Sequence, residues 1–247
     1  MSAPSQSKEV SGLRILAFES SAKAASVAIL QDGALLGEYF QNSGQTHSRT
    51  LAKMAEDLLA NCDLTVADID AVAVAAGPGS FTGVRIGVAA AKGLAWARQL
   101  PCYGVSTLEA MVRGAAMCDG VYCACMDARR AQVYNAVFSV EDGKLLRLSE
   151  DRAISIEELG AELKNLEKAI FLVGDGAELC YNTLRVSIPA LCLLPEHLRG
   201  QHASGTALAA QAKIDAGEPG SGLELIPSYL RLSQAERTRI EKENMGK

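Results

Sequence analysis

Histidine and aromatic residues are scarce in this chain of 247 residues, which has only three histidines and 5% aromatic residues. Two imidazoles bind one metal ion from a helix when they lie about four residues apart, and His47, His197 and His202 include no such pair. No apolar run is long enough to cross a membrane, and residues 1–12 lack the apolar core of a signal peptide. We therefore expect no metal centre, no membrane contact, a flexible tail over residues 1–12 and a cytoplasmic location.

Disulfide and zinc motifs are also missing. The seven cysteines form an odd set without a C-x-x-C pair, so we expect buried, reduced thiols. Cys123 and Cys125 alternate along an expected strand and should point to the same face. The formal net charge of −5 argues against broad, unaided binding of nucleic acid, so any RNA contact needs help from a partner.

What the chain does contain is the pattern of a mixed α/β fold, in which alternating apolar strands precede helices with apolar residues at helical spacing. The pairs Asp32-Gly33 and Asp142-Gly143 predict two tight hairpins. In the first half we expect strands over 14–20, 24–31, 34–41, 71–76 and 102–106, and helices over 48–61 and 82–100.

A similar order starts again at residue 121. Ser155 followed by Glu158 predicts a capping box at a helix start. The expected elements are strands over 121–127, 132–140, 144–148 and 170–173, and helices over 155–166, 177–184 and 204–216, with a poorly defined stretch over 187–202.

Each half thus has the order β-β-β-α-β-α-β, the layout of the ribonuclease-H-like unit. Duplicated, this unit gives the architecture of actin, Hsp70 and the sugar kinases (the ASKHA fold). We expect an N-terminal half over 13–106, which a helix returning near 204–216 joins, a degraded C-terminal half over 107–203, and a C-terminal extension over 217–247.

A glycine-rich turn joins the strand over 71–76 to the long helix. The turn lacks the Lys-Ser/Thr of a Walker loop and is not a dinucleotide fingerprint. Free backbone N–H groups at such a helix start attract anions, although a tight turn without a ligand explains the glycines equally well. The candidate anion-binding residues are Gly77, Gly79, Ser80, Thr82 and Arg85.

Two further turns should face each other across the cleft of a duplicated fold. They are Glu19-Ser20-Ser21 and Asp127-Ala128-Arg129-Arg130, and a kinase of this architecture would also use the Gly174-Asp175-Gly176 turn. A phosphotransferase of this architecture uses an aspartate in the first turn to hold a metal ion, and this chain has Glu19 at that position. The candidate nucleotide-binding residues here are Asp127, Arg129, Gly174, Asp175 and Gly176, and a hairpin with a local ion pair is the alternative for Asp127 and Arg129.

Five segments carry a resemblance to a known family. In chain order they are Phe18-Glu19-Ser20-Ser21, the turn from Gly77 to Arg85, Gly104 to Leu108, Met126 to Arg129, and Pro227-Ser228-Tyr229-Leu230-Arg231. Over nearly its whole length the chain resembles the TsaB (YeaZ) family of bacterial tRNA threonylcarbamoyladenosine (t6A) biosynthesis proteins, which is grouped with the M22 glycoproteases. It departs from the family at Glu19, where Asp-Thr-Ser is usual.

The resemblance implies a non-catalytic scaffold for TsaD, the paralogous transferase. TsaD has two histidines four residues apart on a helix, and the matching positions here are Thr107 and Met111. The resemblance further implies the ATPase TsaE as a partner, a homodimer when the partner is absent, and tRNA contact only within the complex. We expect no catalytic residue, no metal and no cofactor of its own, with ATP or ADP at most at an interface with the partner.

A stripe of small residues on the long helix is the candidate contact surface. Residues four apart along a helix share a face, and small ones let another helix approach closely, or let the helix pack on its own sheet. In proteins similar to TsaB the first two helices form the surface for self-association and for TsaD. The candidate interface residues are Leu51, Met54, Gly83, Gly87 and Ala91, and we expect Gly87→Leu to disrupt assembly while the monomer stays folded.

Two enzyme functions remain as alternatives. An ATP-dependent small-molecule kinase would use Glu19, Asp127 and the turn at Gly174 to handle metal and phosphates. An M22-type peptidase would need either Ser80 as its nucleophile or a metal ion. Neither a serine–histidine–carboxylate arrangement nor a pair of metal ligands can be recognised in the sequence.

Overall fold

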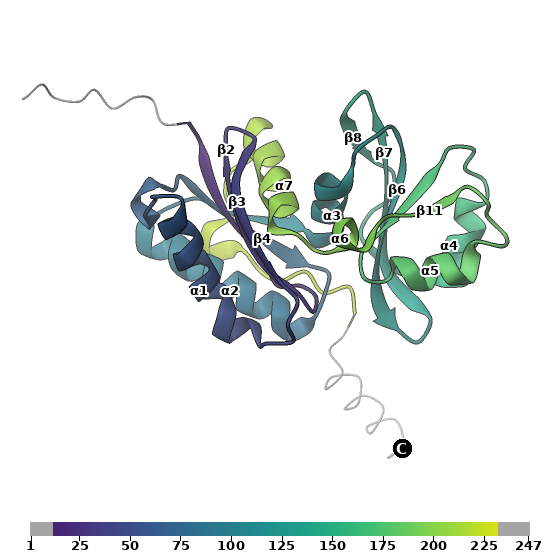
Figure 1. Ribbon diagram of the computed structural model, residues 1–247, viewed down its shortest axis with the longest axis horizontal. Coiled ribbons are helices and arrows are strands. Elements are labelled where there is room, and N and C mark those ends of the chain that lie inside the picture. The colour runs from purple at the N-terminus through teal and green to yellow at the C-terminus, as the bar shows by residue number, and fades with distance from the viewer. Residues whose placement is uncertain (1–11, 232–247) are drawn as a thin grey trace, which may run out of the picture.

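A computed structural model describes residues 12–231 of the chain as two α/β halves joined side by side (Figure 1). The expected tail over 1–12 lies outside the described residues except for Gly12, and so does the part of the C-terminal extension over 232–247. The first half contains β1 (Arg14–Glu19), β2 (Ala25–Gln31), β3 (Ala34–Gln41), α1 (His47–Asn61), η1 (Val66–Asp68), β4 (Ala71–Gly77), α2 (Phe81–Arg98) and β5 (Cys102–Ser106).

The second half repeats this order with one extra strand. Its elements are α3 (Thr107–Ala115), β6 (Gly120–Arg129), β7 (Gln132–Glu141), β8 (Lys144–Arg147), β9 (Arg152–Ser155), α4 (Ile156–Leu163), β10 (Ile170–Val173), α5 (Ala177–Leu184), β11 (Leu191–Leu193) and α6 (Glu196–Arg199). The chain then returns to the first half through α7 (Ala203–Asp215) and η2 (Gly222–Glu224).

Both sheets have the same topology. The first has the order β3-β2-β1-β4-β5, and the second has the order β8-β7-β6-β10-β11, with β9 paired to β7. In each sheet the first three strands are antiparallel neighbours and the last two pair in parallel. The prediction of a duplicated ribonuclease-H-like fold is confirmed.

The halves exchange helices at their junction. Helix α3 follows the last strand of the first sheet but packs on β6 and β7, whereas α7 comes from the second half and packs on β1 and β2. The two helices lie against each other between the sheets (Figure 1). At their crossing an added Cβ on Gly205 would lie 2.1 Å from the carbonyl oxygen of Ala110, so only glycine permits this approach. Helix α3 was not among the helices predicted from the sequence.

Local turn chemistry matches the sequence. Asp32 and Gly33 have φ of 49° and 80°, and Asp142 and Gly143 have φ of 50° and 71°, the left-handed pairs that two-residue hairpins require. Ser155 and Glu158 form the predicted capping box at the start of α4.

All seven cysteines are free, and the Sγ atoms of Cys123 and Cys125 lie 3.6 Å apart on one face of β6. The expectation of burial is wrong for Cys118 and Cys192, which are exposed because one lies in a loop and the other on the outer strand β11.

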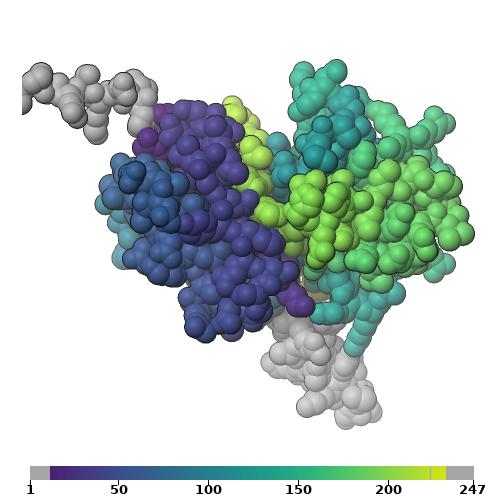
Figure 2. Space-filling model, in the orientation of Figure 1, coloured from purple at the N-terminus to yellow at the C-terminus, as the bar shows by residue number. Residues whose placement is uncertain are grey.

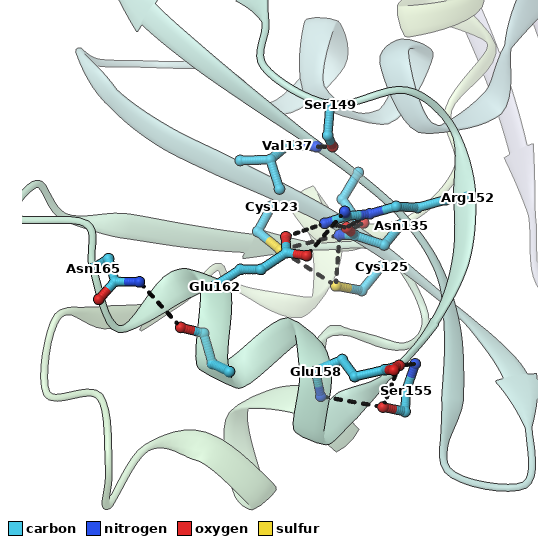
Figure 3. A network of polar contacts seen from close by, with 12 residues as sticks. Cys123, Cys125, Asn135, Val137, Ser149, Arg152, Ser155, Glu158, Glu162 and Asn165 are labelled. Carbon is cyan, nitrogen blue, oxygen red and sulfur yellow. Dashed lines mark hydrogen bonds and ion pairs between the residues drawn. The ribbon is translucent and has the colours of Figure 1, made fainter.

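A buried amide supports the extra strand in the second half (Figure 3). Asn135 on β7 donates to the carbonyl oxygen of Ala124 at 2.9 Å and to Cys123 Sγ at 3.3 Å. Its own oxygen accepts from Arg152 of β9 at 3.3 Å, and Arg152 also pairs with Glu162 of α4. One fully buried residue therefore fixes β9 and α4 on the sheet.

None of the helices within residues 12–231 is both long enough and apolar enough to cross a bilayer.

Candidate functional site

The two halves meet along a seam, shown as a space-filling surface in Figure 2, that contains a cleft of about 700 Å³. Segments from both halves line the cleft: residues 21–23 after β1, 78–81 before α2, 126–129 at the end of β6, Asp175 after β10, and 228–231 near the C-terminus. The carboxyl ends of the central strands β1, β4, β6 and β10 thus meet there, as expected of ligand sites in α/β sheets. The turn after β1 and the turn at Asp127 face one cleft, as the duplicated fold predicts, and Asp175 of the turn after β10 also lines it.

Glu19 lies beneath the floor of this cleft and is only 1% exposed. Its Oε1 accepts from the Ser21 N–H at 2.6 Å, and its buried Oε2 has no partner among the described residues. Burial raises the pKa of Glu19 to about 7, hydrogen bonds from Ser21 and Ser20 lower it in part, and the nearby Asp175 raises it further. The side chain is therefore turned toward its own backbone and does not line the cleft.

The glycine turn is pressed against the turn after β1. Ser80 N–H donates to the Ser21 carbonyl oxygen at 2.6 Å, and a Cβ on Gly79 would lie 2.5 Å from that same oxygen. Gly77 has φ of 117°, and a Cβ there would meet the carbonyl oxygen of Ser228 at 2.4 Å. Close backbone packing on both sides thus explains the glycines by itself.

The start of α2 already uses part of its hydrogen-bonding capacity. Ser80 Oγ caps the helix by accepting from the Gly83 N–H at 3.3 Å. Gly79 and Ser80 line the cleft, whereas Gly77 is buried and Thr82 and Arg85 lie exposed on α2 beside it. An anion at this helix start stays a prediction.

The wall from the second half is built around Asp127. Its carboxylate accepts from the Arg129 N–H at 2.7 Å and forms an ion pair with the Arg129 guanidinium at 3.2 Å. Asp127 and Arg129 therefore form the local ion pair and also line the cleft. Arg129, Arg130 and Ala131 all have positive φ, so a tight left-handed turn holds the two arginines at the tip of the hairpin.

The turn after β10 splits between two hollows. Asp175 accepts from Gln201 at 3.1 Å and lies at the junction of the main cleft and a second hollow of about 660 Å³, which Gly174 also lines. Desolvation by the surrounding walls raises the pKa of Asp175, hydrogen bonding from Gln201 opposes that rise, and Asp127 adds to it. Gly176 does not face either hollow, because it packs against the end of β6.

The C-terminal segment (residues 225–231) closes one side of the cleft. Ser228 N–H donates to the carbonyl oxygen of Ala76 in the first half, and Arg231 donates to that of Ala128 in the second, at 2.7 and 2.6 Å. Tyr229 stacks on Phe81 with ring centroids 4.7 Å apart. Sequence reasoning missed this role, and its only signal was the Pro-x-Tyr-Leu-Arg motif.

The five candidate interface residues all lie inside the first half. Leu51, Met54 and Ala91 are at most 8% exposed and belong to the core between α1, α2 and the sheet. An added Cβ would lie 2.1 Å from Ser20 O at Gly83 and 2.4 Å from Ser20 Oγ at Gly87. The small-residue stripe therefore packs on the chain's own sheet.

This packing corrects the expected outcome of Gly87→Leu. Because a leucine at that position would enter the core, we now expect the substitution to destabilise the monomer itself. Contact with another protein through α1 and α2 stays a prediction, and it would involve the opposite, exposed side of the helices. That side carries Ala52, Ala89, Gly93 and Trp96.

The two positions matched to metal-binding histidines lie on α3. Thr107 is fully buried and its Oγ1 has no hydrogen-bond partner in the described structure, and Met111 is 2% exposed and packs with residues of β6. Residues 12–231 contain no group of three or more His, Cys, Asp or Glu placed to hold a metal ion.

Comparison with known proteins gives a consistent result. A family model described as TsaD, tRNA N6-adenosine threonylcarbamoyltransferase, matches residues 38–236. The tRNA threonylcarbamoyladenosine biosynthesis protein TsaB of Bacillus subtilis is 30% identical over 94% of this chain and 100% of its own length. The Escherichia coli TsaB is 36% identical over 66% of this chain and 72% of its own. The solved structure of YeaZ from Pseudomonas aeruginosa superposes with a TM-score of 0.71 at 26% identity, and covers 88% of this chain and 100% of that one.

Proposed function

From the premise that this chain belongs to the TsaB (YeaZ) family of tRNA threonylcarbamoyladenosine biosynthesis proteins, we propose that it is a non-catalytic subunit that binds and organises the transferase TsaD. TsaD transfers the threonylcarbamoyl group to adenosine, and this chain holds TsaD in its active arrangement. The ATPase TsaE joins the pair, and the chain forms a homodimer when TsaD is absent. The assembly acts on tRNA in the cytoplasm.

One observation carries the non-catalytic role. At the two positions that match histidines of the transferase, this chain has a buried threonine and a buried methionine, Thr107 and Met111. A buried hydroxyl and a thioether inside a hydrophobic core are poor replacements for two imidazoles on one metal ion.

The cleft chemistry supports the same proposal over a kinase. Glu19 is buried beneath the cleft and bonded to its own turn, and Asp127 is paired with Arg129. A metal-dependent kinase needs free carboxylates that face the phosphates. Calorimetry with ATP and magnesium separates the two functions, because tight metal-dependent binding by the chain alone would favour the kinase. For a peptidase, Ser80 is occupied as the cap of α2.

The exposed side of α1 and α2 is the surface that we assign to TsaD. Trp96 is 71% exposed and lies one turn from Gly93, where an added Cβ would meet nothing within 4 Å. Tryptophan is one of the residue types most enriched in interface hot spots, and the small residues beside it let a partner approach the helix closely. This surface can be altered without disturbing the core, unlike the buried stripe on the same helix.

Trp96→Glu and Gly93→Arg are each expected to weaken TsaD binding by about thirtyfold or more, the effect of losing a hot spot of about 2 kcal/mol. Size-exclusion co-elution and calorimetry with TsaD measure the effect. The matched control is Leu146→Glu, which changes an apolar residue of comparable exposure (62%) on β8 of the other half and should leave binding unchanged. If both variants bind TsaD as tightly as the unaltered chain, this surface is not the TsaD-binding surface. If the unaltered chain does not bind TsaD at all, the proposed function is wrong.

A further inference from the structure

A group of basic side chains lies in and beside the cleft, although the chain as a whole is acidic with a net charge of −5. Four separate segments contribute to it: the turn after β1, the start of α2, the β6–β7 turn and the C-terminal segment. We call these residues the basic rim: Lys23, Arg85, Arg129, Arg130 and Arg231. Among the described residues, the side chains that line the cleft include only two acids, Asp127 and Asp175. Fields at such a cleft favour an anionic partner.

The structure holds most of the rim cations in place. Arg231 is bonded to the Ala128 carbonyl oxygen, and Arg129 is paired with Asp127. Arg85 donates to the Tyr229 hydroxyl at 2.8 Å and lies 3.8 Å from the centre of the Phe81 ring. Within residues 12–231, Lys23, Arg85 and Arg130 take part in no ion pair. These three exposed cations remain available to a partner, and so does Arg129, whose side chain is 86% exposed beside its single carboxylate.

An aromatic platform lies within the same rim. Tyr229 lines the cleft, is 41% exposed, and has one face stacked on Phe81 while the guanidinium of Arg85 lies beside the pair. Exposed aromatic rings next to arginine are what unpaired bases stack on in single-stranded RNA recognition, and lysine and arginine neutralise the phosphates. A fully paired helix offers no such base.

We infer that the basic rim is an RNA-binding surface that holds phosphates of an unpaired RNA loop at Lys23, Arg129 and Arg130, with a base of that loop on Tyr229. This inference rests on the proposed function, because it assigns the RNA substrate of the assembly to a surface of this chain. The small number of cations makes the contact weak for the chain alone, so that it acts together with TsaD.

Fluorescence anisotropy with a labelled RNA hairpin that has an unpaired loop tests the inference, with the chain alone and with its TsaD complex. Arg129→Gln combined with Arg130→Gln should weaken binding about tenfold at low salt and flatten the salt dependence by about 0.7 per lost phosphate contact. The control, Lys144→Gln combined with Lys164→Gln, makes the same change in net charge on exposed lysines outside the cleft and should alter neither quantity.

Tyr229 tests the stacking part separately. Tyr229→Ala should abolish the preference for the loop hairpin over a fully paired RNA duplex of the same length, whereas Tyr229→Phe should keep it because the ring remains. Equal losses of RNA affinity in the arginine variant and in the lysine control would overturn the inference. Complete displacement of the hairpin by free ATP would also overturn it, because it would indicate a nucleotide site. TsaD co-elution, measured on every variant, should be unchanged. If the unaltered chain does not co-elute with TsaD, the proposed function is refuted. If TsaD co-elution persists and only RNA binding is absent, the proposed function stands and the inference fails.

Discussion

Gly83→Ala is expected to lower the free energy of unfolding by about 3 kcal/mol, the upper end of ordinary overpacking costs. The added Cβ would lie 2.1 Å from the carbonyl oxygen of Ser20, closer than any real contact. Neither side can move easily, because Ser20 Oγ donates to the Gly83 carbonyl at 2.9 Å and Ser80 N–H donates to the carbonyl of Ser21. Urea unfolding followed by circular dichroism measures the effect.

The same helix supplies a matched control in Gly93. An added Cβ there meets nothing within 4 Å, so Gly93→Ala gains only helix propensity and should stabilise the chain by about 0.5 to 1 kcal/mol. The two substitutions are chemically identical and lie on one helix, so opposite signs isolate the contact with Ser20. If Gly83→Ala unfolds at the same urea concentration as the unaltered chain, the close packing of α2 on the turn after β1 is wrong.

The glycine stripe illustrates what sequence can and cannot decide. Spacing of four residues correctly places Gly83, Gly87 and Ala91 on one face of α2, because helical periodicity is local. Whether that face meets another protein or the chain's own sheet depends on Ser20, sixty-three residues before Gly83, and no local pattern carries that information. Gly93 and Trp96 also lie at helical spacing, but on the exposed side of α2, and the sequence alone does not distinguish that side from the buried one.

Strands and helices with strong local patterns were predictable, and elements that depend on distant partners were not. The range of β5 and that of β10 are predicted without error, since each is a short apolar run between clear breaks. Strand β11 has only three residues and exists through its parallel pairing with β10, so the stretch over 187–202 could not be assigned from periodicity. Strand β9 likewise depends on its pairing with β7 and on Arg152.

In the candidate site too, some features could be predicted from the sequence, and those that depend on distant contacts could not. The turns at Ser21 and Asp127 were predicted to face each other across a cleft because a duplicated topology brings strand ends together, whereas the position of Gly79 in the same cleft was not predicted. The wall formed by Ser228 to Arg231 joins sites more than one hundred residues apart in the sequence, such as Arg231 and Ala128. Only the fold reveals that this segment bridges both halves.

Glu19→Gln is expected to stabilise the chain at pH 8 by about 3 kcal/mol, from about 1.36 kcal/mol for each unit of pKa shift. Burial raises the pKa of Glu19 from 4.5 to about 7, so ionising it inside the protein costs free energy. The native state binds more protons than the unfolded state between pH 4.5 and 7, and stability therefore falls as pH rises through this range. Glutamine stays neutral and still accepts the hydrogen bond from Ser21.

A second glutamate provides a control of opposite sign. Burial raises the pKa of Glu38, but hydrogen bonds from His202, Ser204 and Ser26 outweigh it and hold the pKa below its usual range. Its carboxylate contributes stability that is present above the unfolded pKa and lost as pH falls through the folded one. Glu38→Gln should therefore destabilise the chain at pH 8, where Glu19→Gln stabilises it.

Urea midpoints measured at several pH values from 5 to 8 check both substitutions. The unaltered chain should lose stability over this range relative to Glu19→Gln. The difference between the two should shrink toward pH 5 and vanish only below the unfolded pKa of 4.5, where Glu19 is protonated in both states. If the difference between them is the same at pH 5 and pH 8, Glu19 does not titrate in this range and is not held in the apolar position that the structure gives it. In that case its carboxylate is hydrated and reaches the cleft, which would restore the phosphate chemistry that its burial argues against.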